Sequence, residues 1–219
     1  MAKDAIERQY KMASNRVIVY VDGFNLYYGL KCKGWKRYYW LDLQRLAETL
    51  LLPGQVLVAV RYFTTSISSH TGSTGKSKRQ ATFIEALQTR SNLYIYYGHY
   101  LAKLRRCSTC GAKWKTYEEK MTDVNIAVTL FADAVDDAFD TAIIISGDSD
   151  LSIVVSETRK RYMKKRLIVA FPPARHSAQL RAVATAAFTI GRKVIKDSQF
   201  PDEVTKPDGF VLRRPAKWN

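Results

Sequence analysis

Runs of apolar residues alternate with amphipathic stretches along most of this 219-residue chain. The apolar runs have the length of buried strands, and the stretches between them repeat apolar residues every three or four positions, as one buried helix face requires. Strands are expected at 16–21, 55–64, 93–100, 141–146, 166–171 and, more weakly, 187–190, and helices at 41–51, 78–89, 122–135, 150–162 and 177–184. The alternation predicts βαβ units and a three-layer α/β/α fold with a mainly parallel central sheet.

Several stretches fall outside this alternation. Residues 1–15 are expected to be an N-terminal extension, 16–196 the folded domain and 197–219 a C-terminal tail that is extended on the surface or loose. Residues 66–77 are rich in Ser, Thr and Gly, which predicts a flexible surface loop. Residues 103–119 contain two cysteines among basic residues and are predicted to be a loop inserted in the domain.

Two of the expected strands end in carboxylates. The first runs into Asp22, with Asn25 three residues on, and the fourth runs into Asp148 and Asp150. Each of these residues has a simpler explanation as a helix cap, since Asp, Ser and Asn are favoured at helix N-termini. Capping needs only one acid, whereas Asp148 and Asp150 are two acids two positions apart. Because right-handed crossovers bring the carboxyl ends of parallel strands to one edge, a common acidic site is expected there.

Asp123 opens the expected helix at 122–135 and is the third element of this set. Capping by Thr122 or Asp123 is the alternative. Asp133, Asp136 and Asp137 lie about ten residues further on, or ~15 Å of helical rise, and are expected to be solvated. Converging carboxylates repel one another unless cations neutralise them, and oxygen donors favour Mg²⁺ or Mn²⁺ over Zn²⁺. Such an ion can activate water for attack on a phosphodiester.

The charge balance indicates a polyanionic partner. The formal net charge is +15, which favours nucleic acid or an acidic membrane surface over a neutral ligand. A basic surface without any nucleic-acid role is the simpler alternative. No segment reaches the ~20 apolar residues of a membrane span, and residues 1–16 lack the apolar core of a secretory signal. Three cysteines do not make a disulfide framework, so a cytoplasmic protein is expected.

Three motifs resemble those of NYN domains, relatives of the PIN-like ribonucleases that include the LabA-like proteins. They are the segments 21–27, 120–124 and 146–151, and the resemblance runs from about residue 16 to residue 190. It implies a PIN-like fold and metal-dependent hydrolysis of RNA by metal-activated water, without a protein nucleophile. The implied catalytic set is Asp22, Asn25, Asp123, Asp148 and Asp150, in which the four aspartates hold Mg²⁺ or Mn²⁺ and Asn25 orients Asp22 or a bound water.

Within that set Asp22 and Asp148 are the first choices as direct ligands, and Asp150 is expected to share its role with helix capping. Ser146 and Ser149 are expected to donate hydrogen bonds to the carboxylates. Aromatic residues at 27, 28, 35, 38 and 39 stack on unpaired bases or belong to the core. Basic residues that follow strand ends are expected to ring the site and bind RNA, most simply single-stranded RNA: Lys31, Lys33, Lys36, Arg37, Lys76, Lys78, Arg79, Lys103, Arg105 and Arg106. The basic cluster at 159–166 precedes a strand and is expected on the opposite edge.

Cys107 and Cys110, followed by a glycine, resemble one knuckle of a zinc ribbon. Structural zinc takes four ligands, and the remaining candidates are Cys32 and His99. The alternatives are reduced thiols in a loop, or a redox or dimer-bridging role. The sequence leaves the oligomeric state open, a dimer included.

Two rival functions are weighed against the nuclease. An RNA-binding module with a PIN-like fold and little or no turnover is the first, and four acids at one site argue against it. A HAD-like phosphatase is the second. That chemistry needs an aspartate two residues after the nucleophile, where this chain has Phe24.

Overall fold

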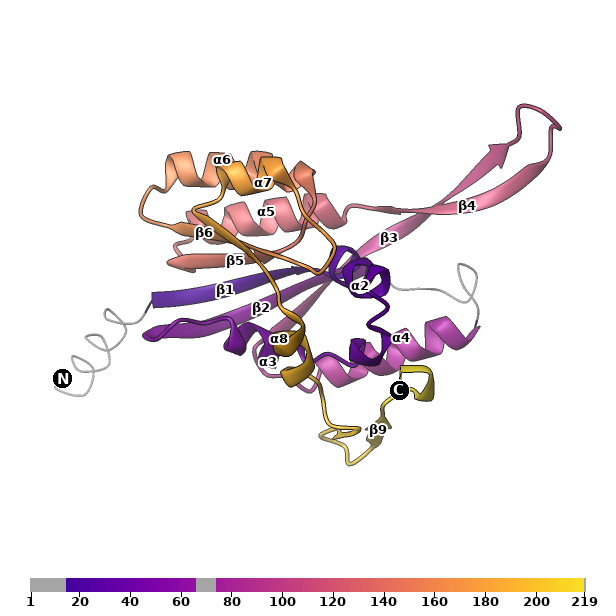
Figure 1. The fold of residues 1–219 in the computed structure, drawn as a ribbon, viewed down its shortest axis with the longest axis horizontal. Helices are drawn as coiled ribbons and strands as arrows, with labels where there is room; N and C mark the ends of the chain where they lie inside the picture. The colour runs from indigo at the N-terminus through magenta and orange to yellow at the C-terminus, as the bar shows by residue number, and fades with distance from the viewer. Residues whose placement is uncertain (1–14, 66–73, 219) are drawn as a thin grey trace.

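A seven-stranded sheet forms the centre of the computed structural model, which describes residues 15–65 and 74–218. The strand order is β4-β3-β2-β1-β5-β6-β7. Neighbouring strands are parallel except β3 and β4, which are antiparallel. The strands are β1 (Asn15–Asp22), β2 (Gln55–Thr65), β3 (Leu93–Arg106), β4 (Lys113–Lys120), β5 (Thr141–Ile145), β6 (Arg166–Phe171) and β7 (Ala186–Thr189) (Figure 1).

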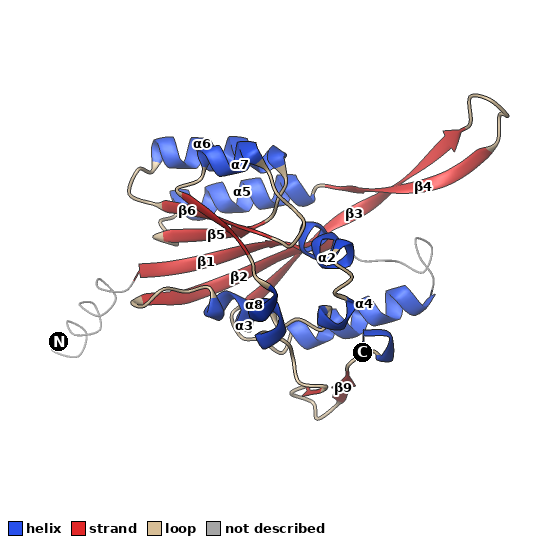
Figure 2. Ribbon diagram, viewed as in Figure 1, coloured by secondary structure: helices blue, strands red, loops and turns tan. Residues whose placement is uncertain are grey.

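Helices cover both faces of this sheet (Figure 2). One face carries α2 (Gly23–Cys32), α3 (Leu43–Thr49), α4 (Thr74–Leu87) and α8 (Arg192–Asp197), and the other carries α5 (Thr122–Val135), α6 (Ser152–Arg161) and α7 (Ala178–Val183). Three short 3₁₀ helices lie at Lys36–Tyr38 (η1), Ser149–Leu151 (η2) and Ala216–Trp218 (η3). The expected three-layer α/β/α fold with a mainly parallel sheet is confirmed.

The apolar run of β1 is continuous because both faces of this strand are covered. Val17, Val19 and Val21 pack into the core on the α2 side, whereas Ile18 and Tyr20 pack into the core on the α5 side. A strand covered on both faces needs apolar residues at successive positions. The same requirement explains the uninterrupted run of β5, in which all five residues are buried.

Two helices were missed by the sequence pattern. In α2 the buried positions include Leu26 and Leu30, but Tyr27 and Tyr28 are exposed on the same helix. Exposed aromatic residues blur the apolar period, so the pattern gave no bounds for this helix, although Asn25 was interpreted as a possible cap near the start of one. The six-residue α8 is too short to show a period.

The expected inserted loop at 103–119 is instead a β-hairpin. β3 continues to Arg106 and pairs in antiparallel register with β4, so the two strands project well beyond the sheet (Figure 1). Lys103, Leu104 and Trp114 are exposed on it. No helix layer covers this ribbon, so its sequence need not alternate apolar and polar residues, and the pattern does not indicate a strand. Of the expected loop at 66–77, residues 66–73 lie outside the described part, and α4 already begins at Thr74.

The expected C-terminal tail contributes to the core. Phe200, Val204 and Leu212 are buried in the cluster on the α2 side, and the indole Nε1 of Trp40 donates a hydrogen bond to the carbonyl of Pro201 at 2.7 Å. The segment forms a small hairpin, β8 (Glu203–Thr205) with β9 (Val211–Arg213), before η3. Sequence patterning missed this because the apolar residues are widely spaced between prolines.

Asp133 corrects another expectation. It was expected to be solvated, yet it is buried on the face of α5 that also presents Ile126 and Leu130. Tyr20 donates to its Oδ2 at 2.6 Å, and the guanidinium of Arg61 contacts its Oδ1 at 2.5 Å. Within the described ranges, no helix is long and apolar enough to cross a membrane.

Candidate functional site

The carboxyl edge of the sheet contains a topological switch point at β1. From β1 the chain builds the sheet outward through β2 and β3, and it later returns to the other side of β1 as β5 and β6. Open parallel sheets bind ligands in the crevice where the strand order reverses in this way. Val21 pairs with Ile145, so Asp22 and Ser146 leave two neighbouring strands at the same level.

The Asp22 carboxylate is buried, with 2% of the residue exposed, and accepts three hydrogen bonds. Its Oδ1 accepts from the backbone N–H of Asn25 at 3.0 Å, which caps α2. Its Oδ2 accepts from Asn25 Nδ2 at 2.7 Å and from Ser146 Oγ at 2.8 Å. Burial raises the pKa of Asp22, these hydrogen bonds oppose the rise, and the charge of Asp148 adds to it. Asn25 and Ser146 thus fix the orientation of this carboxylate.

The same two residues tie the loop after β5 to β1. The side-chain oxygen of Asn25 accepts from the N–H of Gly147 at 3.2 Å, and Ser146 Oγ accepts from the N–H of Asp148 at 3.0 Å. Asp148 Oδ1 accepts from the N–H of Asp150 at 3.1 Å and caps η2, whereas Asp150 itself is exposed. Capping was expected to involve Asp150, but it falls on Asp148.

Asp123 lies in the first turn of α5 but does not cap it. The N-cap residue is Met121, in the left-handed region at φ 76°, and no side chain forms a capping hydrogen bond there. The capping alternative is therefore not realised by Thr122 or by Asp123. Burial, followed by the charges of Asp148, Asp22 and Asp150, raises the pKa of Asp123 to about 6. The four aspartates thus lie within one another's electrostatic field.

The donor chemistry of this edge fits a divalent cation. All the donors are carboxylate oxygens. Burial and, after it, the charges of the other three aspartates raise the pKa of Asp123, and a cation would relieve the repulsion among them. In the part of the chain that the structure describes, no three His, Cys, Asp or Glu side chains lie close enough to hold a metal ion by themselves. Mg²⁺ usually takes one or two carboxylates and completes its shell with water and substrate phosphates, so an open acidic edge suits it.

Two glycines allow the backbone to approach closely at this edge. A Cβ on Gly23 would lie 2.7 Å from the carbonyl oxygen of Phe63, and one on Gly147 would lie 2.9 Å from Cβ of Arg175. Any larger residue at either position would push a neighbouring segment away. Gly23 directly follows Asp22 and Gly147 directly precedes Asp148, so these contacts set where both acids lie.

Arg175 is a candidate site residue that the sequence analysis did not name. It packs against Gly147, its guanidinium lies 5.9 Å from the ring centre of Tyr28, and its Nε is buried without a hydrogen-bond partner among the described residues. The residue follows the end of β6 at the same sheet edge. Asp22 and Asp148 were expected at the site because they follow strand ends. The same rule applied to β6 would have indicated Arg175.

The expected RNA-binding residues fall into three groups. Those at 31–37 lie from the last turn of α2 to η1, those at 76–79 lie in the first turns of α4, and those at 103–106 lie on the projecting hairpin. All are exposed except Arg79, which is half-buried. Among the aromatic candidates Tyr27 and Tyr28 are exposed, Trp35 and Tyr39 are half-buried, and Tyr38 belongs to the core.

The expected zinc ligands do not assemble. Cys107 and Cys110 lie in the turn of the hairpin, whereas Cys32 ends α2 and His99 pairs with Lys120 near the base of the hairpin. No three of these candidate ligands meet, although all four lie in the described part of the chain. The N–H groups of Cys110 and Thr109 lower the pKa of the Cys107 thiol to about 7. The cysteines are free thiols.

Comparison with known families agrees with this geometry. The family model described as the NYN domain matches residues 16–191, which include all four aspartates. The chain belongs to the NYN domain family. This family is part of the PIN-like ribonuclease superfamily, so the resemblance seen in the three sequence motifs is confirmed.

Two individual proteins are similar to this NYN chain. A protein of unknown function from Vibrio parahaemolyticus has a crystal structure that matches 82% of this chain and 95% of its own, with a TM-score of 0.54 and 20% identity. The 6-hydroxy-3-succinoylpyridine 3-monooxygenase HspA of Pseudomonas putida is 28% identical over an alignment length of 180, and the match covers 67% of this chain. The match covers 56% of that relative, so the chain spans about half the length of the curated protein it matches.

Proposed function

We propose that this NYN domain is a divalent-metal-dependent endoribonuclease that hydrolyses RNA phosphodiesters at the carboxyl edge of its sheet. The observation that carries the proposal is that Asp22 and Asp148 follow two neighbouring strands at one sheet edge and are linked through the hydroxyl of Ser146. Burial, followed by the charges of Asp148, Asp22 and Asp150, also raises the pKa of Asp123 to about 6. A protein gains nothing in stability from unneutralised carboxylates that share one edge of a sheet. Such a cluster is expected where a site must hold cations.

We assign different roles in metal binding to these residues. Asp22 and Asp148 are the proposed direct ligands of Mg²⁺ or Mn²⁺, and Asp123 and Asp150 the ligands that act through water or a second ion. Asn25 and Ser146 hold Asp22 in one orientation through the hydrogen bonds at 2.7 and 2.8 Å. A divalent ion at this edge would supply an acidified water and charge stabilisation for the phosphodiester.

The substrate is argued from charge and from exposed rings. A formal net charge of +15 attracts a polyanion. Arg175, whose Cβ lies beside Gly147, adds a positive charge at this edge. Tyr27 and Tyr28 follow Asp22 on α2 and are 43% and 40% exposed. Exposed aromatic rings stack on bases that are not paired. Single-stranded RNA is therefore the proposed substrate.

The alternative proposal is an RNA-binding module without turnover. A binding surface has no need for acids, because carboxylates repel phosphate. The monooxygenase activity named for the Pseudomonas relative is not proposed, because the chain spans about half of that protein and the acidic edge offers no argument for it.

The decisive experiment starts from metal-free protein and labelled single-stranded RNA, to which Mn²⁺ or Mg²⁺ is then added. Asp148→Asn is the matched inactive variant, since an amide oxygen still accepts from the N–H of Asp150 and preserves the η2 cap. Asp136→Asn makes the same change at an exposed position beyond the other end of α5. Cleavage by wild type and Asp136→Asn, but not by Asp148→Asn, is the expected result.

Equal cleavage by all three proteins would indicate a contaminating nuclease, and absence of cleavage by the wild type would reject the enzyme proposal. Tight RNA binding with no cleavage in either metal would favour the binding module.

A further inference from the structure

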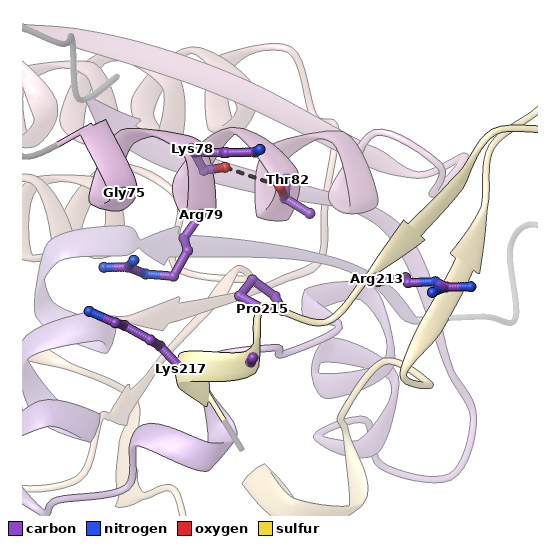
Figure 3. A pocket seen from close by; sticks show the side chains of 8 residues that line it. Gly75, Lys78, Arg79, Thr82, Arg213, Pro215 and Lys217 are labelled. Carbon is purple, nitrogen blue, oxygen red and sulfur yellow. Dashed lines mark hydrogen bonds between the residues drawn. The ribbon is translucent and has the colours of Figure 1, made fainter.

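A pocket of about 360 Å³ lies between the first turns of α4 and the C-terminal segment (Figure 3). Residues from 75 to 82 form one wall, and residues from 213 to 217 form the other. The two walls come from distant parts of the sequence, and they meet because the C-terminal segment packs on the core. The lining residues are Gly75, Lys78, Arg79, Thr82, Arg213, Pro215, Ala216 and Lys217.

The pocket is lined by four cations and by no acid. Arg213 forms an ion pair with Glu203 at 3.1 Å. Lys78, Arg79 and Lys217 form no ion pair with any residue that the structure describes. In Figure 3 the charged ends of Arg79 and Lys217 point to the same side of the pocket. Placing like charges on one concave surface is favourable only when an anion neutralises them.

Phosphate is the anion that these groups suit. Arginine recognises phosphate oxygens with a planar pair of donors, and lysine adds a point charge that adjusts to them. α4 is 14 residues long, and Gly75 in its first turn lines the pocket, so the positive end of the helix dipole adds to the field on that side.

A series of aromatic rings leads from this pocket to the acidic edge. Trp218 of η3 packs on Tyr39 with ring centres 5.9 Å apart, and Tyr39 packs on Tyr27 at 5.0 Å. Tyr27 then contacts Tyr28 at 5.2 Å, and Tyr28 stacks on Phe24 at 6.2 Å. Phe24 is two residues beyond Asp22. Tyr27 and Tyr28 are exposed, and the other three rings are half-buried. An unpaired strand that follows this series would have its backbone at both places.

We propose that this pocket is a phosphate-binding subsite that anchors the backbone of an RNA strand away from the scissile bond. The inference rests on the proposed function for its choice of RNA. The chemistry recognised is a phosphodiester group. Arg79 and Lys217 are the main contacts, and Lys78 lines the α4 wall of the same pocket. The pocket sets how far the strand extends from the acidic edge and therefore favours longer RNA over a dinucleotide.

The test measures binding alone, so that it does not depend on catalysis. Fluorescent single-stranded RNA is titrated with Asp148→Asn protein in EDTA over a series of NaCl concentrations. Arg79→Ala and Lys217→Ala are made in that background, together with Lys164→Ala, which removes an exposed charge just before β6, at the opposite edge of the sheet. Each lost phosphate contact reduces the slope of log K against log salt by about 0.7 for a single strand.

The expected result is a reduced slope for Arg79→Ala and for Lys217→Ala, and an unchanged slope for Lys164→Ala. Arg79→Lys and Lys217→Arg should retain the wild-type slope, which separates lost charge from lost folding. Binding of a dinucleotide should be equal in all variants.

Equal slopes for all three alanine variants would overturn the inference. A second arm titrates inorganic phosphate and follows the heat of binding. Phosphate binding that is lost in Lys217→Ala, with RNA slopes unchanged, would define a small-anion site and would also overturn the anchoring role. Because no cleavage is measured, these outcomes differ from failure of the nuclease proposal, which appears as wild-type protein that binds RNA normally without cutting it.

Discussion

Replacing Ser146 with alanine removes one hydroxyl that joins two segments of the site. Ser146 is fully buried. Its Oγ donates to Asp22 at 2.8 Å and accepts from the N–H of Asp148 at 3.0 Å. The first bond ends on a buried carboxylate, where a hydrogen bond contributes about 1.5–3 kcal/mol. Loss of the second bond leaves the N–H of Asp148 without its acceptor, but Asp148 is only half-buried, so water can reach this group. We expect the free energy of unfolding to fall by about 2–3 kcal/mol.

The matched control is Ser198→Ala. Ser198 is also fully buried, but its hydroxyl has no hydrogen-bond partner among the described residues. Removing it should change the free energy of unfolding by less than about 0.5 kcal/mol. Urea unfolding followed by tryptophan fluorescence measures both variants. A loss of 2–3 kcal/mol also corresponds to a fall in Tm of about 4–12 °C for a domain of this size.

The two serine variants also separate stability from function. Ser146→Ala should weaken Mn²⁺ binding, because Asp22 loses a donor that holds its orientation and lowers its pKa. Ser198→Ala should bind Mn²⁺ as the wild type does. If both variants lose the same stability within about 0.5 kcal/mol, the bridge through Ser146 does not contribute as its geometry implies.

Three further predictions follow from the charges. The pKa of Asp123 is raised to about 6, so the unfolded chain loses this proton at lower pH than the folded protein does. Asp123 therefore becomes destabilising as pH rises from about 4 to 6, and it stays so above pH 6. In thermal unfolding, Asp123→Asn should have a higher Tm than the wild type at pH 7 and the same Tm near pH 4. Mn²⁺ at about 100 times its Kd should stabilise the wild type by about 2.7 kcal/mol at pH 7, measured as a rise in Tm, and much less in Asp148→Asn; an equal rise in both proteins would place the ion elsewhere. Asp133→Asn leaves Arg61 partly buried without its charge partner and should cost about 3 kcal/mol in urea unfolding, so a loss under about 1 kcal/mol would contradict the buried pair.

The acidic set was accessible from sequence for a topological reason. Buried parallel strands read as continuous apolar runs, and their carboxyl ends share one edge, so Asp22 and Asp148 were expected together. Which acid caps a helix depends on single hydrogen bonds that no spacing encodes. Asp148 caps η2 and Asp150 is exposed, the reverse of the expected sharing.

The pattern of apolar and polar residues gave wrong predictions where burial does not repeat regularly along the chain. In the β3–β4 hairpin, residues 103–106 and 112–115 are exposed, so no buried face imposes an apolar alternation on them. Asp133 lies on the buried face of α5, which its position at i+3 from Leu130 indicates, but a charge there is tolerated only because Arg61 and Tyr20 meet it. Those partners come from two other strands.

The chain by itself determined the α/β alternation, the acids at two strand ends, the NYN motifs and the strong positive charge. These are local properties, since a strand end, a helix period and a charge total each depend on residues close together or on simple sums. Only the tertiary structure decided that Asn25 and Ser146 hold one carboxylate in common, that Arg175 packs beside Gly147, and that Arg79 and Lys217 face one pocket. Each of these pairings joins segments far apart in the chain, and the packing of the whole core, including its C-terminal segment, brings them together.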